Sequence, residues 1–210
     1  MVVLGIDTCL NACSAAVLDG DVVLGASSEV MARGHQERLA PMVQAVMARA
    51  GLPFSRLERI GVTVGPGSFT GLRVGVAFAK GLASALDLPA SGVGVLEALA
   101  AEADGLVAAV LDARRDQVYL QIFEDGAALM APDVLPIGTA AGRLVELSMG
   151  RALTLVGSGG PLLAGAAAAG SRIVAREGCD ARAVARLAAS RPAAPLRPLY
   201  LRAPDAKAPA

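Results

Sequence analysis

Histidine and cysteine are scarce in this chain of 210 residues, which holds one histidine, His35, and three cysteines. Cys9, Cys13 and Cys179 form an odd and sparse set, so no disulfide framework is predicted. Cys9 and Cys13 have no histidine or further cysteine near them in the sequence, which is a poor pattern for a metal site. We therefore expect three buried thiols and no metal on this chain.

Long apolar runs and an excess of charge of one sign are also missing. Glycine, proline, aspartate and arginine interrupt every apolar stretch, so none approaches the roughly 20 residues that span a bilayer. The chain opens on a strand pattern, not on a basic segment followed by a long apolar one, and we expect a cytoplasmic protein with no membrane partner. The 19 basic and 19 acidic residues balance, so any contact with RNA has to be local or supplied by a partner.

Apolar residues, by contrast, are plentiful. They make up 54% of the chain and give it a mean hydropathy of +0.55. That is enough apolar material to fill the core of one large domain or two small ones. We therefore expect a folded globular protein.

The most informative segment is the glycine-rich stretch 65–73, which reads Gly-Pro-Gly-Ser-Phe-Thr-Gly-Leu-Arg. It follows the apolar run 60–64 and opens a helix-patterned segment that reaches about Leu86. Unpaired N–H groups and the dipole at a helix N-terminus suit a phosphate or another anion. A tight strand-to-helix turn packed on a neighbour explains the same residues, and the stretch matches neither the P-loop nor the dinucleotide-binding pattern. Both interpretations stay open.

The first hundred residues predict three strands, a helix, a strand and a second helix. The strands are expected at 2–6, 14–18 and 22–30, with a hairpin turn at 19–20, and at 60–64. One apolar helix face is formed by Leu39, Met42, Val43, Val46, Met47 and Ala50. Gly51 ends this helix, and Pro41 predicts that its regular part starts nearby.

The second half repeats this order. Strands are expected at 106–111, 117–123 and about 128–135, a helix at 139–149, a strand at 152–156, a glycine-rich turn at 157–160 and an alanine-rich helix from Pro161. The residues do not repeat, but the order of elements does. The pattern therefore predicts a duplicated α/β fold with a boundary near 101–105.

Four sequence motifs carry a family resemblance: Ile6-Asp7-Thr8, the stretch 65–73, Asp112-Ala113-Arg114 with Val118-Tyr119, and Leu199-Tyr200-Leu201-Arg202. Together they resemble the bacterial TsaB family, formerly called YeaZ, over nearly the whole chain. The resemblance implies the fold of the actin, sugar-kinase and Hsp70 superfamily, with two ribonuclease-H-like lobes. Residues 1–104 would form the first lobe with the partner-binding helices. Residues 105–210 would form the second, with a C-terminal segment that can return to the first.

The resemblance also implies a function. Members act with the related catalytic subunit TsaD and the ATPase TsaE in threonylcarbamoyl transfer to adenosine 37 of tRNAs that read codons beginning with A. This chain would be a non-catalytic subunit that forms a heterodimer with TsaD, or a homodimer when alone, and meets tRNA through the complex. ATP would be used by the complex, with no cofactor on this chain.

A second class of function stays open, namely a phosphate-processing ATPase or kinase of the sugar-kinase type. In the superfamily an aspartate after the first strand helps to position metal and phosphate, and Asp7-Thr8 occupies that place. The candidate phosphate or nucleotide contacts are Asp7, Thr8, Gly65, Gly67 and Ser68. An aspartate at a strand end is also a common turn former, and we expect Gly65 and Gly67 to hold positive φ in either case.

Other catalytic arrangements are not supported. The catalytic relative holds a metal with two histidines on one helix, and one histidine cannot supply such a pair. We expect a capping or surface role for His35. A triad at Ser68 would need His35, its sole candidate base, at a distance that the sequence does not give. The charged turn at 112–116 predicts a solvated hairpin with ion pairs, with a substrate contact as the alternative.

The predicted partner interface lies on the two helices of the first lobe. Gly75, Ala79 and Ala83 form a small-residue stripe at i, i+4 and i+8 that lets another helix approach closely. Leu39, Met42 and Val46 give the neighbouring helix an apolar face. In the resembled family these two helices pack against the equivalent pair of TsaD, so these six residues are the expected contacts.

Overall fold

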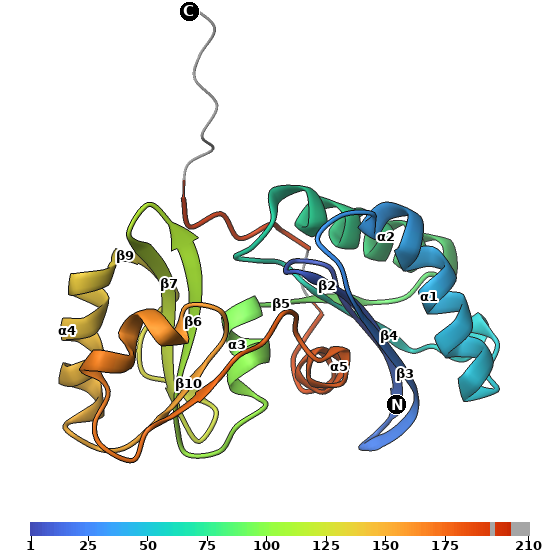
Figure 1. Ribbon diagram of the computed structural model, residues 1–210. Coiled ribbons are helices and arrows are strands. Elements are labelled where there is room, and N and C mark those ends of the chain that lie inside the picture. Colours follow the sequence, from blue (N-terminus) through green and yellow to red (C-terminus); the bar gives the residue numbers. More distant parts are fainter. Residues whose placement is uncertain (194–195, 203–210) are drawn as a thin grey trace, which may run out of the picture.

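Two α/β lobes stand side by side in the computed structural model, which describes residues 1–193 and 196–202 (Figure 1). Each lobe is built around one mixed β-sheet. Two helices lie between the lobes in Figure 1, and the remaining helices cover the outer faces. The ends of strands from both sheets lie at the junction between the two lobes.

The first sheet has five strands in the order β3-β2-β1-β4-β5. Its central strand β1 pairs antiparallel with β2 and parallel with β4. The strands are β1 (Val2–Asp7), β2 (Ala12–Asp19), β3 (Val22–Val30), β4 (Arg59–Thr63) and β5 (Ala90–Val93). Residues of β1 and most of β2 are buried on both faces of the sheet, as their continuous apolar sequences require.

Helices α1 (His35–Ala50) and α2 (Phe69–Leu86) cover one face of this sheet. The short 3-10 helix η1 (Phe54–Arg56) lies between α1 and β4 in the chain, and α2 follows β4. The apolar face predicted for α1 is buried, and the helix ends at Gly51, whose φ is 66°. The predicted start near Pro41 was wrong, because the helix begins at His35. Pro41 is exposed, so water can hydrate the carbonyl group that its missing N–H leaves unpaired.

The second sheet repeats the topology of the first, with the order β11-β10-β6-β7-β8 and β9 also paired to β7. Its central strand β6 pairs antiparallel with β7 and parallel with β10, as β1 does with β2 and β4. The elements are β6 (Leu106–Arg114), β7 (Gln117–Glu124), β8 (Ala127–Ala128), β9 (Asp133–Pro136), α4 (Ile137–Ser148), β10 (Thr154–Val156), η2 (Gly160–Ala166) and β11 (Arg172–Val174). The predicted duplication is confirmed.

Two predictions for the second lobe were wrong. The strand expected at 128–135 is split into β8 and β9, because Pro132 lies between them and cannot donate to a ladder. The alanine-rich segment after Pro161 forms the 3-10 helix η2 and no α-helix. Leu163 is its one large side chain that is buried, so little packing energy is available to extend a helix.

The lobes exchange their last helices. Helix α3 (Val95–Ala100) follows the last strand of the first sheet but packs on β6 and β7 of the second. Helix α5 (Ala181–Ala189) follows β11 and packs on β1, β2 and β4 of the first sheet, on the face opposite α1 and α2. The chain then continues along the first lobe, where the Leu199 N–H donates to the Val64 carbonyl at 2.7 Å. Helix α3, from residues 1–104, therefore packs on the second sheet, and α5, from residues 105–210, packs on the first.

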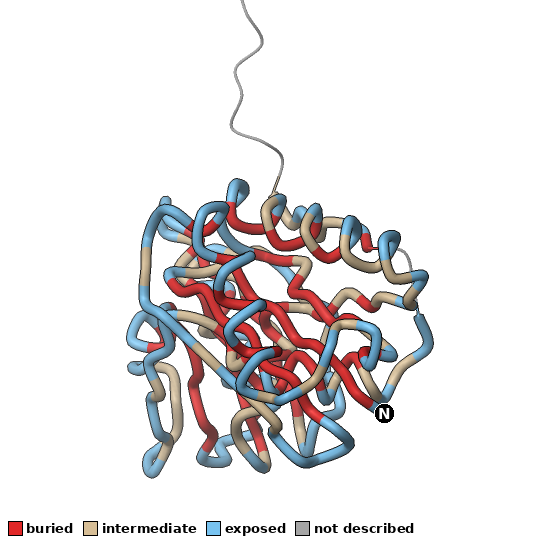
Figure 2. The backbone as a smooth tube through the Cα atoms, turned by 90° about the vertical axis from the view of Figure 1, so that its right-hand side faces the viewer, coloured by how far each residue is buried: buried red, intermediate tan, exposed pale blue. Residues whose placement is uncertain are grey.

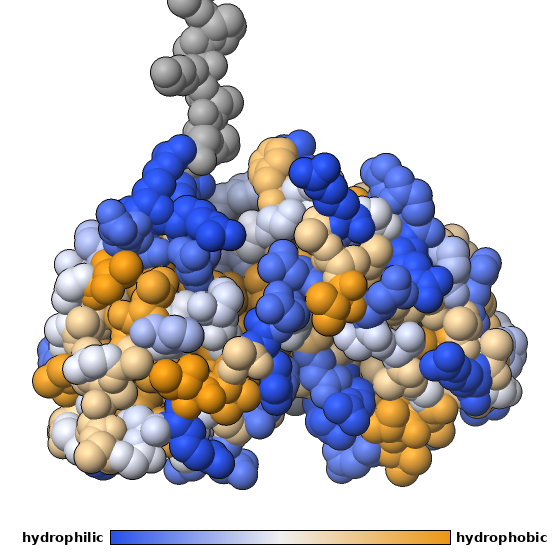
Figure 3. Space-filling view, in the orientation of Figure 1, coloured by the Kyte–Doolittle hydropathy of each residue, from blue (hydrophilic) through white to orange (hydrophobic). Residues whose placement is uncertain are grey.

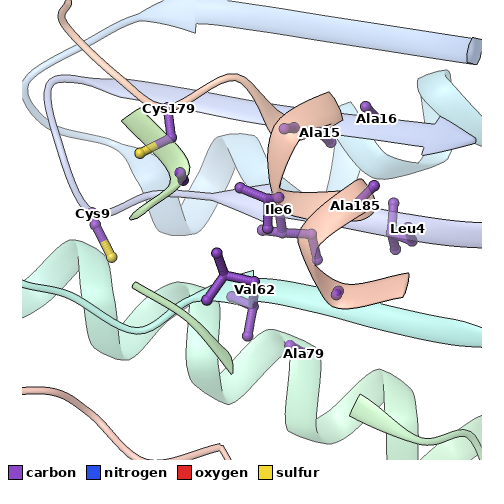
Figure 4. Packing of buried hydrophobic residues seen from close by; sticks show 14 of the residues in the cluster. Leu4, Ile6, Cys9, Ala15, Ala16, Val62, Ala79, Cys179 and Ala185 are labelled. Atoms are coloured by element: carbon purple, nitrogen blue, oxygen red, sulfur yellow. The ribbon is translucent and has the colours of Figure 1, made fainter. Parts of the chain in front are cut away.

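The larger core lies in the first lobe and extends across the junction. Figure 2 shows buried residues concentrated in the central strands, with exposure increasing toward the outer turns. Figure 4 shows part of this core, in which Ile6, Val62 and Ala79 lie among the buried side chains. Leu111 and Val156 of the second sheet belong to the same cluster, so the two lobes share apolar contacts.

Candidate functional site: the cleft between the lobes

A cleft of about 390 Å³ opens where the central strands of the two sheets end. Hydrophilic side chains gather along this junction in the space-filling view (Figure 3). Both lobes contribute to its wall. The lining residues are Cys9, Leu10, Asn11, Gly67, Ser68, Leu111, Asp112, Ala113, Arg114, Tyr119, Ser158, Arg176 and Glu177.

The glycine-rich loop forms one wall of the cleft. Gly65 has a φ of 106°, and the peptide bond that follows it, to Pro66, is cis. Gly67 is exposed, and a Cβ added there would lie 2.3 Å from the carbonyl oxygen of Cys9. The predicted positive φ is therefore found at Gly65, while Gly67 is not among the residues with positive φ and is a glycine because the backbone of the β1–β2 turn approaches it.

Ser68 is the N-cap of α2. Its Oγ accepts a hydrogen bond from the Gly71 N–H at 3.2 Å, and its own N–H donates to the Cys9 carbonyl at 2.7 Å. These bonds are those of a tight strand-to-helix turn packed on a neighbour. The turn interpretation of the glycine-rich stretch thus accounts for its geometry without a ligand.

Asp7 is fully buried and does not face the cleft. Its Oδ1 accepts hydrogen bonds from the Thr63 hydroxyl at 2.6 Å and the Cys9 N–H at 3.0 Å. Its Oδ2 accepts from the Cys179 N–H at 2.9 Å, close to the start of α5. Both carboxyl oxygens are therefore engaged by the chain itself, and Asp7 joins β1, β4 and the segment before α5.

Burial governs the protonation of the groups around Asp7. It raises the pKa of the Asp7 carboxyl above its ordinary value, while the three hydrogen bonds oppose that rise. Burial and the charge of Asp7 raise the pKa of the Cys9 and Cys179 thiols, and in the same way raise that of Cys13 to about 11. All three cysteines are buried and unpaired, as predicted. Thiols held protonated are poor nucleophiles and poor metal ligands.

Thr8 is also enclosed, with a side chain that is 1% exposed. Its hydroxyl donates to the Gly71 carbonyl at 2.7 Å, which fixes the first turn of α2 against the end of β1. Of the five predicted phosphate or nucleotide contacts, the structure brings Gly67 and Ser68 to the cleft. It places Asp7, Thr8 and Gly65 behind the cleft wall.

Several cleft residues were missed by the sequence prediction. Arg176 and Glu177 come from the connection between β11 and α5, which no motif distinguished. Asn11 lies in the β1–β2 turn and donates to Glu177 at 3.2 Å. Asp112 and Arg114 belong to the charged turn for which ion pairs were predicted, and they form one at 3.2 Å. Both residues line the cleft.

His35 does not have the predicted capping or surface role. It is 7% exposed, and its Nε2 has no hydrogen-bond partner within the described part of the chain. The N-cap of α1 is Gly34, which holds a φ of 88°. Within the described residues, no group of three or more histidine, cysteine, aspartate and glutamate side chains is arranged to hold a metal ion.

Comparisons with known proteins point to one family. The sequence model described as TsaD, tRNA N6-adenosine threonylcarbamoyltransferase, matches residues 24–175. An uncharacterized protein of Mycobacterium tuberculosis is 38% identical over 98% of this chain and 93% of its own length. The tRNA threonylcarbamoyladenosine biosynthesis protein TsaB of Bacillus subtilis is 39% identical over 59% of this chain and 56% of its own length. The solved structure of YeaZ from Pseudomonas aeruginosa is similar with a TM-score of 0.80 and 28% identity, over 95% of this chain and 99% of that one.

The chain belongs to the TsaB (YeaZ) family. The predicted fold is confirmed as well. ROK hexokinase from Thermus thermophilus, a sugar kinase, has a TM-score of 0.53 at 16% identity, over 90% of this chain and 99% of that one, and this likeness concerns the fold alone. No helix among residues 1–193 and 196–202 is long and apolar enough to cross a membrane.

The residues predicted for the partner interface from the TsaB resemblance are mostly buried inside the first lobe. Leu39, Met42 and Val46 are 0–2% exposed, because the apolar face of α1 packs on the first sheet. Ala79 is 0% exposed, and a Cβ at Gly75 would lie 2.4 Å from the Thr8 hydroxyl oxygen. Ala83 is half-buried. The stripe therefore belongs to the internal core, and its residues are not free to form the predicted interface.

Gly67→Val is expected to lower the free energy of unfolding by about 1–3 kcal/mol, because the new side chain collides with the Cys9 carbonyl. Thermal and urea unfolding of the purified chain measure this loss. The matched control is Gly81→Val on α2, where an added Cβ meets nothing within 4 Å and a smaller change is expected. Equal stability of the two variants would show that the loop has room to move away.

Proposed function

We propose that this chain is a non-catalytic subunit in the biosynthesis of threonylcarbamoyladenosine in tRNA, acting with TsaD and TsaE homologues. The relatives from Bacillus subtilis and Escherichia coli are named as tRNA threonylcarbamoyladenosine biosynthesis proteins, and the matching family model is that of a threonylcarbamoyltransferase. In this proposal the complex uses ATP and modifies adenosine 37 of tRNAs that read codons beginning with A. We propose that it does so in the cytoplasm.

The burial and hydrogen bonding of Asp7 are the main support for the non-catalytic role. An aspartate that positions metal and phosphate needs free oxygens directed at the cleft. Both oxygens of Asp7 accept hydrogen bonds from the chain, and the residue is 0% exposed. This speaks against the alternative of a phosphate-processing ATPase or kinase, which depends on Asp7 and the glycine-rich loops.

The outward sides of α1 and α2 are the surface that we propose for TsaD. We call it the outer helix face, and its residues are small and exposed: Pro41, Ala45 and Ala48 on α1, and Ala77, Gly81 and Ala85 on α2. Small side chains let two helices of a partner approach closely. In the absence of TsaD, we propose that the same face supports a two-fold homodimer.

Reconstitution tests this proposal. The chain should co-purify with the TsaD homologue of the same organism, and threonylcarbamoyladenosine should form only when chain, TsaD and TsaE homologues are combined with ATP, the other substrates and tRNA. The chain alone should not hydrolyse ATP at an enzymatic rate. Turnover near 1 per second by the isolated chain, of the order found for enzymes, would support the kinase-type alternative instead.

A further inference from the structure

An exposed aromatic pair lies at the start of α2. The rings of Phe69 and Tyr200 are 5.8 Å apart between centroids and inclined by 34°. Arg73 places its guanidinium carbon 3.7 Å from the centroid of the Phe69 ring. Phe69 and Tyr200 are each 47% exposed, in a chain with six aromatic residues, four Phe and two Tyr. Such exposure of paired rings beside a cation is typical of a binding surface.

The C-terminal segment connects this pair to the second lobe. Leu199 is hydrogen-bonded to Val64 of the first lobe. Arg202, two residues after Tyr200, donates to the Ala113 carbonyl at 2.8 Å and also to the Gln117 side chain. The segment that carries Tyr200 is thereby attached to the residues on either side of the turn between β6 and β7.

That turn is a tight hairpin that exposes arginine. Three consecutive residues other than glycine, Arg114, Arg115 and Asp116, have φ of 63°, 54° and 55°. Positive φ at Arg115 and Asp116 is the expected geometry of a two-residue hairpin loop between β6 and β7, and Arg114 extends it by one residue. The Arg114 side chain is 85% exposed, and its ion pair with Asp112 lies at the surface, where such pairs contribute little. A phosphate can therefore take the place of Asp112 at small cost.

Arg114 lines the cleft, and so does Ser68, the residue directly before Phe69. Phe69 and Tyr200 are not among the lining residues and are exposed next to Ser68, outside the cleft. We call Phe69, Arg73, Arg114 and Tyr200 the aromatic–arginine surface. Proteins bind unpaired RNA by stacking bases on aromatic rings and by pairing arginine with phosphates. The chain has no net charge, so an RNA contact has to be local, as this surface is.

We propose that the aromatic–arginine surface binds an unpaired loop of tRNA, so that this subunit contacts the RNA directly. The inference rests on the proposed function for the identity of the RNA. RNA matches this surface because two of its four residues are arginines and the other two are exposed aromatic rings. Phe69 and Arg73 continue the stripe of α2 that holds Ala77, Gly81 and Ala85, so the test below also measures TsaD binding.

Binding of a fluorescein-labelled tRNA transcript that reads a codon beginning with A tests the proposal. Anisotropy titrations use the reconstituted complex with TsaD and TsaE homologues, and also the isolated chain. Tyr200→Leu and Arg114→Ala are each expected to weaken binding about tenfold, by loss of a stacked base or a phosphate contact. Arg114→Ala should also reduce the slope of log affinity against log salt by about 0.7. Tyr200→Phe keeps the ring and should bind like the wild type.

Arg143→Ala is the matched control, because Arg143 is an exposed, ion-paired arginine on α4. An equal loss of affinity in this variant would show nonspecific attraction and overturn the proposal. Size exclusion with TsaD separates the two proposals. If the variants lose TsaD but keep the tRNA affinity of the isolated chain, the surface is a protein interface and the inference fails. If the wild type does not bind TsaD, the proposed function fails, while the tRNA affinities still decide this inference.

Discussion

Ala79→Arg is expected to abolish folding of the chain. Ala79 lies on the side of α2 that packs against the first sheet and is 0% exposed. An arginine there would bring an unpaired charge into a closely packed apolar core, at a cost above about 4–5 kcal/mol. That is a large part of the roughly 5–15 kcal/mol that stabilises a typical domain. Circular dichroism and size exclusion should show an aggregated product without a cooperative melting transition.

Gly81→Arg is the matched variant on the same helix. Gly81 is exposed, and a Cβ at this position meets nothing within 4 Å. The variant should therefore fold with a melting temperature close to that of the wild type, yet lose TsaD, because a long charged side chain would stand in the outer helix face. Wild-type affinity for TsaD in calorimetric titration would place the interface elsewhere. A folded Ala79→Arg variant would contradict the packing of α2 described above.

The architecture could be predicted from the sequence because its signals are local. Alternating or continuous apolar runs, glycine-containing turns and one apolar helix face occur in the same order in both halves. The sheets follow this order, with β1 and β6 in the same topological place. The exchange of α3 and α5 between lobes could not be predicted in this way, because it depends on contacts between residues far apart in sequence.

The buried side of α2 was assigned wrongly for a physical reason. Small residues recur at i, i+4 and i+8 on two sides of this helix, as Gly75, Ala79 and Ala83 and as Ala77, Gly81 and Ala85. A spacing pattern does not say which stripe faces the sheet. The choice follows from tertiary contacts, because Gly75 lies against Thr8 and Val62.

The surroundings of the candidate site also depend on tertiary contacts that the sequence pattern does not give. The place of Asp7 after the first strand was apparent from the sequence, but its surroundings were not. One of its three hydrogen-bond donors, the N–H of Cys179, is 172 residues away in sequence. A single aspartate at a strand end therefore looks the same whether it faces an open cleft or is enclosed by a distant segment.

Asp7→Asn is expected to lower the free energy of unfolding by about 1–3 kcal/mol. An asparagine can replace Oδ1, which accepts from Thr63 and Cys9, but its NH₂ group then faces the N–H of Cys179, and two donors cannot pair. The start of α5 should loosen as a result. Chemical denaturation measures the loss, and Asp21→Asn, at an exposed position of the β2–β3 turn, is the control with an expected change below about 0.5 kcal/mol.

The difference in free energy of unfolding between the wild type and Asp7→Asn should depend on pH, and this dependence tests the role of the Asp7 carboxyl group. Burial raises the pKa of Asp7 in the folded state, so the folded chain holds the carboxyl proton more tightly than the unfolded chain does. The stability gained from that proton is complete below the unfolded pKa, near 4, and is lost as the pH rises through the raised folded value. The gap between wild type and Asp7→Asn should therefore narrow from acid to neutral pH. A variant that keeps wild-type stability at every pH, and instead abolishes ATP turnover by the isolated chain, would make Asp7 a catalytic residue and contradict the structural role.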